Sequence, residues 1–289
     1  MPTFPKMIEK IKQDVSGTAF VVNYSRSKMV NISKDTYAHL WVTPDSISLW
    51  NGLAKDVYTN DDLNVSLRNR FYLERLKKFI NENEDVVFIG IASGFVNYPF
   101  LVEGDCSFIE FDLPNIVEFK KKKVMQWMQE GRLPARKIEY ISIDLSDEKQ
   151  RFILKEALNK AIGRNPSFVT MEGITYYLKR EILNDIFRIL KEVQRQGSIV
   201  AFDYWKPDTM EYTVMARLKE YLDKKFGYKD KEWDLFDQTY IKEIKGYIEI
   251  ESADISKLEL EYSETRLLQG KENKIPVYFS VLERNREKD

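Results

Sequence analysis

The sequence predicts an α/β fold in which helices cover a doubly wound, mostly parallel sheet. Three observations lead to this fold class. Short apolar runs alternate with helical patterns through the middle of the 289-residue chain, a turn of small residues follows the first run, and acidic residues end several of the runs. Alternation of this kind is typical of parallel strands that are joined by crossover helices.

Five apolar runs predict the strands of this sheet. Val86–Ile91 has the continuous apolar pattern of a fully buried strand. The other four follow in order along the chain: Ser107–Phe111, Ile138–Ile143, Ser167–Met171 and Ser198–Tyr204. Amphipathic stretches with apolar residues at helical spacing lie between them, and these predict the crossover helices.

The regions on either side of these strands have a different character, and we expect a single domain over residues 1–289. The closing part of the chain contains two further apolar runs, Tyr247–Ile250 and Pro276–Leu282, the second with near alternation. The predicted parts are a helical cap (1–83), a ligand-binding core (84–205), a helical lid insertion after the fifth strand (206–245) and closing strands (246–289).

The composition excludes several classes of protein. The 45 Lys and Arg residues balance 46 Asp and Glu residues, so net charge gives no reason to expect nucleic acid or an anionic membrane as a partner. Cys106 and His39 are the only residues of their types, which excludes a cysteine-based zinc site or a multi-histidine metal site. The longest uncharged run, 86–102, contains turn residues and is too short for a membrane span, and the charged N-terminus lacks a secretion signal. We expect a cytoplasmic protein without a metal centre, in which the run Lys120–Lys123 faces solvent.

Candidate ligand-binding residues stand at the carboxyl ends of the predicted strands, where open α/β sheets bind ligands. The first strand runs into Gly90-Ile-Ala92-Ser-Gly94, a turn that lets a ligand approach the backbone closely. A carboxylate at Asp112 suits a ribose, because it accepts hydrogen bonds from two hydroxyl groups. The acidic residues at the ends of the next four strands are Asp112, Asp144, Glu172 and Asp203.

Each of these residues also has a structural explanation. Asp112 can cap a turn before Pro114, and Asp144 can be the N-cap of the next helix. Glu172 has the weakest structural explanation, because a carboxylate that ends a buried strand needs a partner. The pattern fits two cofactors, a nicotinamide dinucleotide and S-adenosylmethionine. A dinucleotide-binding loop would carry a third glycine after Gly94, and carboxylates suit a positive sulfonium, so the pattern favours S-adenosylmethionine.

Several short segments between residues 16 and 205 match the motifs of one known family. They are Ser16-Gly-Thr-Ala19 with Arg26, Leu67-Arg68-Asn-Arg70, Ile91-Ala-Ser-Gly94, Glu110-Phe-Asp-Leu-Pro114 with Lys120, Asp144-Leu145, Glu172-Gly173 with Tyr177-Leu178, and Gly197-Ser198. Together they resemble the leucine carboxyl methyltransferase family, which includes bacterial members of the tetracenomycin O-methyltransferase type. The resemblance implies a class I, Rossmann-like methyltransferase with S-adenosylmethionine as its cofactor.

The resemblance also implies roles for individual residues. Arg68 would meet the methionine carboxylate and Glu172 would lie near the methionine amino group. The glycine turn would pass under the methionine and ribose, Asp112 would hold the ribose hydroxyls, and Asp144 with Leu145 would frame the adenine. The predicted cofactor-binding residues are Arg68, Gly90, Ala92, Gly94, Asp112, Leu113, Asp144, Leu145 and Glu172, and the predicted substrate contacts are Arg26, Tyr177 and Tyr204.

The sequence departs from the family pattern at the glycine turn. Family members usually read Leu-Gly-Ala-Gly, then an aromatic residue or Leu, then Asp-Thr-Arg. Here Ala92 replaces the first glycine, and Val96-Asn97-Tyr98 replaces the Asp-Thr-Arg. The departure predicts a change in the cofactor pocket or in the support beneath it.

The function predicted from the sequence is that of an enzyme, an S-adenosylmethionine-dependent O-methyltransferase. The first candidate acceptor is a carboxylate of a small molecule, which is ionised at neutral pH and needs no general base. A hydroxyl of a polyketide-like metabolite is the alternative acceptor, with His39 or a strand-end carboxylate as base. Two further alternatives are a nicotinamide-dependent oxidoreductase and a cofactor-binding protein with weakened or lost catalysis. The sequence assigns no catalytic residue and no oligomeric state.

Overall fold

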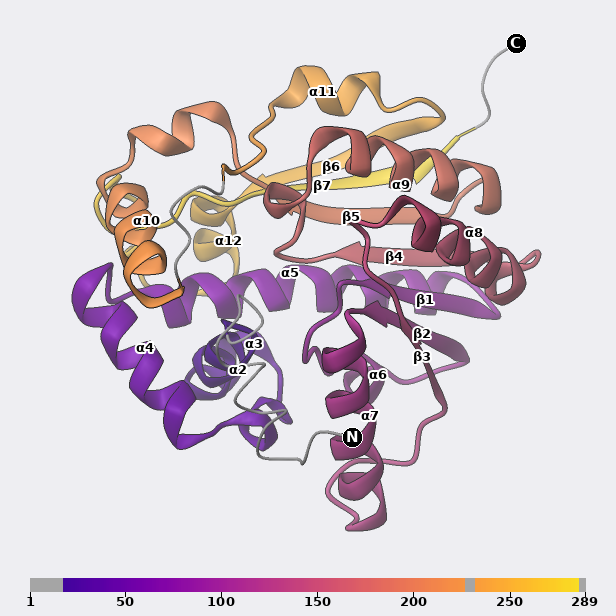
Figure 1. Ribbon diagram of the computed structural model, residues 1–289, viewed down its shortest axis with the longest axis horizontal. Helices are drawn as coiled ribbons and strands as arrows, with labels where there is room; N and C mark the ends of the chain where they lie inside the picture. Colours follow the sequence, from indigo (N-terminus) through magenta and orange to yellow (C-terminus); the bar gives the residue numbers. More distant parts are fainter. Residues whose placement is uncertain (1–17, 227–231, 286–289) are drawn as a thin grey trace.

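Seven strands form one sheet between two layers of helices, as Figure 1 shows for the computed structural model, which describes residues 18–226 and 232–285. The sheet order is β3-β2-β1-β4-β5-β7-β6. Four of its six strand pairs are parallel, and the other two are antiparallel because β7 runs antiparallel to both β5 and β6. The strands are β1 (Val86–Ile91), β2 (Cys106–Asp112), β3 (Ile138–Ser142), β4 (Ser167–Met171), β5 (Ile199–Tyr204), β6 (Tyr247–Asp254) and β7 (Tyr278–Arg284). The predicted fold class is confirmed.

Helices precede, connect and follow these strands. Those before the sheet are α2 (Thr18–Lys28), α3 (Val30–Ser33), η2 (Ala38–Trp41), α4 (Pro44–Asp56) and α5 (Asp61–Glu82). Those among the parallel strands are α6 (Tyr98–Leu101), α7 (Pro114–Gln129), α8 (Glu148–Ile162), η3 (Thr175–Tyr177) and α9 (Arg180–Val193). Those after β5 are η4 (Pro207–Glu211), α10 (Thr213–Phe226), α11 (Gln238–Glu243) and α12 (Ile255–Tyr262). None of the described helices is both long and apolar enough to cross a lipid bilayer.

The two faces of the sheet bury separate apolar clusters. Phe88 and Phe168 point toward α5, while Val87 and Val169 on the same strands point toward α8 and α9. All six residues of β1 are buried, as expected for a central parallel strand that is covered on both faces. The order of the strands reverses between β1 and β4, because the chain proceeds from β1 to β2 and β3 and then returns to the other side of β1. Ligands of doubly wound sheets bind at such a reversal.

The sequence located most strands within one or two residues and missed one helix. The predicted strands Val86–Ile91 and Ser167–Met171 agree with β1 and β4. Between the closing strands the chain forms α12, which was not predicted. Asp254 caps this helix by accepting hydrogen bonds from the N–H groups of Ser256 and Lys257, at 2.8 and 3.0 Å. A short helix with a strand on each side has too few turns to produce a clear periodic pattern.

One surface prediction is wrong. Lys120 was expected to face solvent with the rest of its lysine run, yet only 2 % of it is exposed. Its ammonium lies 2.7 Å from the carboxylate of Glu110, which is also buried. The burial of Lys120 is therefore electrostatically compensated on the inner side of α7.

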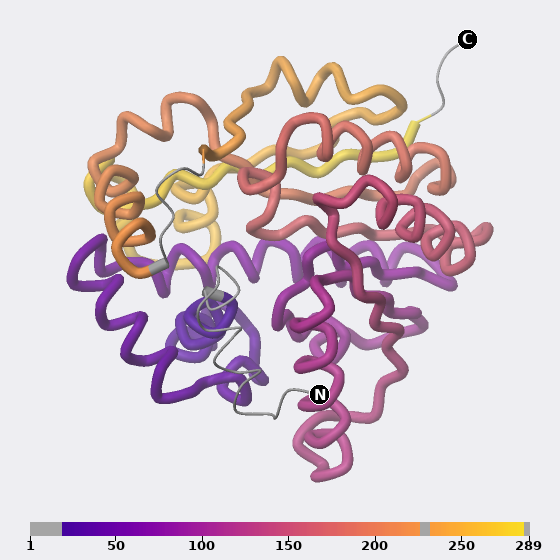
Figure 2. Tube along the Cα trace, viewed as in Figure 1, coloured from indigo at the N-terminus to yellow at the C-terminus, as the bar shows by residue number. Residues whose placement is uncertain are grey.

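The helices α2, α3 and α4 lie with α10 toward one end of the molecule, at the left of Figure 1, and α5 runs from that end along the sheet. Figure 2 shows the indigo trace of α4 beside the orange trace of α10, and the Tyr221 hydroxyl on α10 donates a hydrogen bond to the Leu49 carbonyl on α4, at 3.0 Å. Ser16 and Gly17 of the first matching motif and residues 227–231 of the predicted insertion lie outside the described residues.

Candidate functional site

A cavity of about 340 Å³ opens where the strand order reverses, at the carboxyl ends of β1, β2 and β4. Two sets of residues line it. The strand-end wall consists of Ala92, Ser93, Gly94, Asp112, Leu113, Glu172 and Gly173. The helical wall consists of Val21, Val22, Leu49, Leu53, Tyr58, Asp61, Asn64, Val65, Leu218, Tyr221, Leu222, Ile275 and Val277. Arg26 on α2 and Arg68 on α5 also line the cavity and reach the strand ends.

The turn after β1 brings the backbone to the cavity. Gly94 adopts a φ of +48° and Ala92 a φ of +53°, in the left-handed region that favours glycine. Gly90 lies within β1 and not on the cavity wall. A Cβ added there would come within 2.9 Å of the Ser93 Cβ, so the absence of a side chain at Gly90 leaves room for Ser93 in the turn.

Asp112 holds this turn to the end of β2. Its carboxylate accepts hydrogen bonds from the N–H groups of Gly94, at 2.6 Å, and Leu113, at 2.7 Å. Burial raises the pKa of Asp112, and the two backbone hydrogen bonds oppose that shift. A carboxylate has about four lone-pair positions, so this side chain still has acceptor capacity toward the cavity. The turn-capping explanation therefore describes Asp112, and its ligand-binding role stays a prediction.

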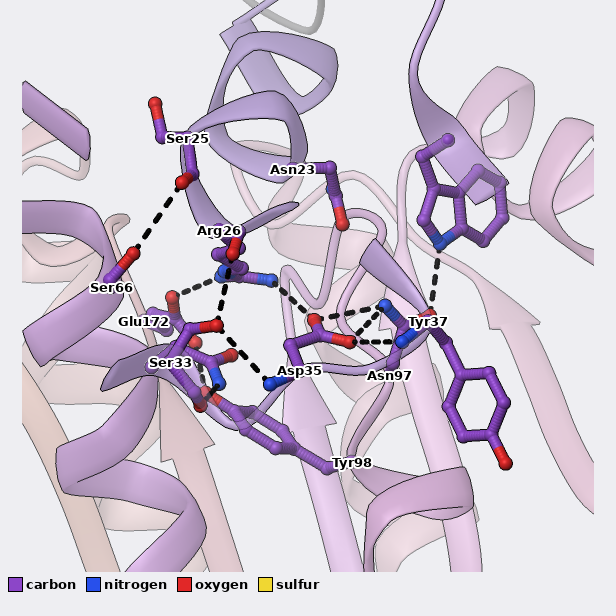
Figure 3. A network of polar contacts seen from close by, with 12 residues as sticks. Asn23, Ser25, Arg26, Ser33, Asp35, Tyr37, Ser66, Asn97, Tyr98 and Glu172 are labelled. Carbon is purple, nitrogen blue, oxygen red and sulfur yellow. Dashed lines mark hydrogen bonds and ion pairs between the residues drawn. The ribbon is translucent and has the colours of Figure 1, made fainter. Parts of the chain in front are cut away.

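Glu172 is the centre of a buried polar network, which Figure 3 shows. Its carboxylate accepts hydrogen bonds from Arg26 and from the Tyr98 hydroxyl, both at 2.5 Å. It also accepts one from Arg68, at 3.2 Å. Burial alone would raise the pKa of Glu172, but Arg26 and Arg68 outweigh burial and hold the pKa below its usual range. This carboxylate has the partners that the end of a buried strand requires.

Asn97 and Tyr98, two of the residues that depart from the family pattern, belong to the same network. Asp35 lies 3.9 Å from Arg26 and accepts hydrogen bonds from the Asn97 amide, at 2.9 Å. The Asn97 carbonyl oxygen accepts a hydrogen bond from the Trp41 indole, also at 2.9 Å (Figure 3). Asn97 is 1 % exposed, and Tyr98 is also buried. Neither residue is on the cavity wall. At Asn97 and Tyr98 the departure thus lies in the support beneath the pocket, where sequence reasoning did not identify Asp35 as the partner, whereas Ala92 and Val96 line the cavity itself.

Arg68 is neutralised from two sides. Besides its hydrogen bond to Glu172, it lies 3.9 Å from Asp203 at the end of β5. Burial lowers the pKa of Arg68, but Tyr176 and the two carboxylates outweigh this and hold the pKa well above its usual range. The guanidinium packs over Gly173, where a Cβ would come within 3.2 Å of it. Gly173 therefore makes room for the arginine.

Besides Gly90, three more predicted site residues lie away from the cavity wall. The Asp144 carboxylate accepts hydrogen bonds from the N–H and hydroxyl of Ser146, at 2.9 and 2.6 Å, and the N-cap of α8 is Asp147. Leu145 is packed among core residues of the α8 and α9 face. Tyr204 is 1 % exposed, and its ring stacks on Phe236 with centroids 4.9 Å apart. Of the predicted substrate contacts, Arg26 and Tyr177 line the cavity.

His39 does not face the cavity. It is exposed, and its Nδ1 lies 2.9 Å from the Thr36 carbonyl oxygen. This position offers no contact with a ligand in the cavity.

Sequence reasoning missed the polar residues of the helical wall. Asp61 accepts hydrogen bonds from the hydroxyls of Tyr58, at 3.0 Å, and Ser25, at 3.3 Å. The Asn64 amide donates to the Ile275 carbonyl, at 2.8 Å. In the sequence, Asp61 resembles an ordinary acidic residue in the first turn of a helix, where the helix dipole favours it, so no pattern distinguishes it.

The strand-end wall fits S-adenosylmethionine in its chemistry. The Ser93 hydroxyl and the Asn23 carbonyl oxygen are buried without a hydrogen-bond partner among the described residues, and both residues line the cavity. The turn at Gly94 leaves backbone accessible, and Asp112 supplies an acceptor for hydroxyl groups. Glu172 and Arg68 also line the cavity, and they are a carboxylate and a guanidinium of the kinds that bind ammonium and carboxylate groups.

Comparisons with known proteins concern the family and the fold of the chain. The family model described as leucine carboxyl methyltransferase matches residues 18–191. A structure of a DUF574 family protein from Streptomyces avermitilis MA-4680 is similar, with 14 % identity, a TM-score of 0.61 and coverage of 93 % of this chain and 97 % of that one. A candidate methyltransferase from Thermobifida fusca YX is similar with 12 % identity, a TM-score of 0.60 and coverage of 85 % and 90 %. A search among curated protein sequences finds no match.

Proposed function

The chain belongs to the leucine carboxyl methyltransferase family, and we propose on this premise that it methylates an oxygen atom of a small molecule. As a member of this family it is a methyltransferase whose cofactor is S-adenosylmethionine. The observation that carries the proposal is the single cavity in which the strand-end wall and the helical wall meet. One wall has the polar groups that a nucleoside cofactor needs, and the other has the apolar surface that a small acceptor needs.

The strand-end wall would hold the cofactor through residues that already have fixed positions. In this proposal Asp112 accepts hydrogen bonds from the ribose hydroxyls, Glu172 lies near the amino group and Arg68 near the carboxylate. Leu113 offers an apolar surface on the cavity wall, 36 % of it exposed. When bound, the cofactor supplies an electrophilic methyl group on a sulfonium. The roles of Asp144 and Leu145 remain predictions, since neither residue lines the cavity.

The helical wall favours a hydroxyl over a carboxylate as the acceptor. The Tyr221 hydroxyl donates its hydrogen to a backbone carbonyl, and the Asn64 amide uses one of its two hydrogens in the same way, so only the second Asn64 hydrogen is left for an anionic ligand. Arg26 is already paired with Glu172, and Arg68 is the residue that this proposal gives to the carboxylate of the cofactor. Asp61 adds negative charge to the same wall. A carboxylate acceptor remains the prediction from the sequence, while these charges support the alternative, a hydroxyl group.

Calorimetric titration tests the proposal directly. We expect S-adenosylmethionine and S-adenosylhomocysteine to bind in the micromolar range and NAD(P) not to bind. Tight binding of NAD would support the oxidoreductase alternative. Binding of S-adenosylmethionine without methyl transfer to any acceptor would support a cofactor-binding protein that has lost catalysis. Absence of binding by all of these nucleosides would contradict the proposal.

A further inference from the structure

Asp61 differs from the other carboxylates of the cavity in the groups that surround it. Glu172 is paired with two arginines, and Asp112 accepts hydrogen bonds from two backbone N–H groups. Asp61 is 9 % exposed, and no lysine or arginine in the described part of the chain forms an ion pair with it. Lys28 on α2 pairs instead with the adjacent Asp62, at 2.8 Å. Asp61 is thus a buried carboxylate without a neutralising cation.

The neighbours of Asp61 leave part of its carboxylate available. Its two oxygens each accept one hydrogen bond, from Tyr58 and from Ser25, although a carboxylate has about four lone-pair positions. Burial raises the pKa of Asp61, and the negative charge of Asp62 adds to the rise. The hydrogen bonds from Tyr58 and Ser25 and the positive charge of Arg68 oppose it. A buried carboxylate in this state gains from a further hydrogen bond or from a proton.

The position of Asp61 is fixed relative to the strand-end wall. Ser25, which donates to Asp61, is followed on α2 by Arg26, which binds Glu172 at the end of β4 (Figure 3). The Ser66 hydroxyl on α5 donates to the Ser25 carbonyl, at 3.5 Å, and joins the two helices (Figure 3). The Asp61 carboxylate is therefore linked through Ser25 and Arg26 to the polar network of the proposed cofactor site.

Resting on the proposed function, we propose that Asp61 is the catalytic base for an apolar acceptor that carries a hydroxyl group. The Asp61 carboxylate accepts the hydrogen bond of the acceptor O–H and takes its proton while the oxygen lone pair forms the bond to the methyl carbon. The electron pair of the broken carbon–sulfur bond stays on sulfur, and the proton leaves Asp61 for solvent after the product departs. Apolar side chains of the helical wall, such as Leu53 and Leu222, receive the body of the acceptor.

An amine is a poorer acceptor for this arrangement. Next to an ionised carboxylate an amine is favoured in its protonated form. The protonated nitrogen has no lone pair to receive the methyl group. A neutral hydroxyl beside Asp61 keeps its lone pairs and has a base for its proton.

The experiment uses the full chain saturated with S-adenosylhomocysteine and two probes with the same ring, 2-naphthol and 2-naphthoate. Asp61→Asn keeps the shape of the side chain and removes its charge, and Asp62→Asn is the matched control one residue away. We expect the wild type and Asp62→Asn to bind 2-naphthol about tenfold more tightly than 2-naphthoate, and Asp61→Asn to lose most of this preference. With S-adenosylmethionine, methylation of 2-naphthol should fall about 10²–10⁴-fold in kcat in Asp61→Asn.

The outcomes separate the inference from the proposed function. If S-adenosylhomocysteine does not bind the wild type, the proposed function fails before Asp61 is tested. If it binds, then preference for 2-naphthoate, binding of neither probe, or equal turnover in Asp61→Asn and the wild type overturns the role of Asp61. Binding of S-adenosylhomocysteine to Asp61→Asn with wild-type affinity shows that this variant is folded.

Discussion

The strand-end wall and the helical wall of the cavity are built in opposite ways. The strand-end wall comes from the ends of three strands, and its carboxylates already have partners inside the protein, two arginines for Glu172 and two backbone N–H groups for Asp112. The helical wall comes from α2, α4, α5, α10 and residues 275–277, and is apolar around one carboxylate without a cation. The residues of the proposed cofactor site are therefore positioned by the strands of the sheet. The residues of the proposed acceptor site come together only when helices that are far apart in the sequence pack against one another.

The largest effect should come from removing the charge at the centre of the strand-end wall. Glu172→Gln keeps the shape of the side chain but leaves Arg26 and Arg68 without their shared carboxylate. We expect the free energy of unfolding to fall by about 3–5 kcal/mol, as for other buried ion pairs that lose one partner. Denaturant unfolding at pH 7 measures this. Glu74→Gln, which breaks a more exposed pair with Arg70, is the control and should cost no more than about 1 kcal/mol.

The same residue predicts how stability depends on acid. The pKa of Glu172 in the folded protein lies below its ordinary value of 4.5. Its stabilising contribution is therefore complete above that ordinary value and is lost as pH falls through the lower folded pKa. Unfolding curves between pH 2 and 7 should be less acid-sensitive for Glu172→Gln than for the wild type, in line with the fewer protons that the variant takes up. Equal acid sensitivity would mean that Glu172 is not ionised in the folded protein.

The next effect concerns affinity and not folding. Asp112→Ala should weaken the binding of S-adenosylhomocysteine by a few kcal/mol, because each hydrogen bond to a charged group contributes about 1.5–3 kcal/mol. Asp144→Ala is the control, because Asp144 follows the neighbouring strand β3 but lies off the cavity wall. Its carboxylate accepts a hydrogen bond from Ser146. This variant should leave affinity nearly unchanged. If Asp112→Ala lowers the melting temperature without changing affinity, Asp112 acts only as a cap of the glycine turn.

A smaller effect should follow from restoring glycine in the turn. Ala92 has a φ of +53°, and a left-handed conformation costs a non-glycine residue about 1–2 kcal/mol. Ala92→Gly should therefore raise the free energy of unfolding by about 1 kcal/mol, after the greater freedom of glycine in the unfolded chain is deducted. Thermal unfolding measures the change. A loss of stability would show that the turn tolerates alanine without strain.

The smallest effect should be at His39. His39→Gln alters an exposed side chain away from the cavity, so methyl transfer should keep its wild-type rate. A rise in rate between pH 6 and 7.5 that disappears in His39→Gln would identify His39 as the base and would contradict the role of Asp61.

Sequence patterns identified the sheet and the strand-end wall because their signals are local. The apolar run of β1 leads within a few residues to Gly94, and Asp112 and Glu172 each end an apolar run. Parallel strands bring such ends to one edge of the sheet, so the pattern alone indicates their proximity. Arg26 and Arg68 came from the family resemblance, and the structure places both on the cavity wall.

The remaining features depend on contacts between distant residues. Lys120 stands among exposed lysines in the sequence, and only its approach to Glu110 accounts for its burial. Asp61 meets Ser25 across 36 positions of chain, and Asn97 meets Asp35 across 62. Neither pairing leaves a periodic signal. The same limit explains Tyr204, which ends a strand but packs against Phe236 from the region after α10.

The order of the last two strands has a consequence for the synthesis of the protein. β6 precedes β7 in the chain, yet its place in the sheet is reached only through β7, which lies between β5 and β6. Until Tyr278–Arg284 has left the ribosome, β6 has no neighbour to pair with, and the edge of β5 stays open. The nascent chain must therefore carry an unpaired strand and an exposed sheet edge through the synthesis of α12 and the segment after it. A stop codon shortly before Tyr278 would remove one strand from the sequence and two from the sheet.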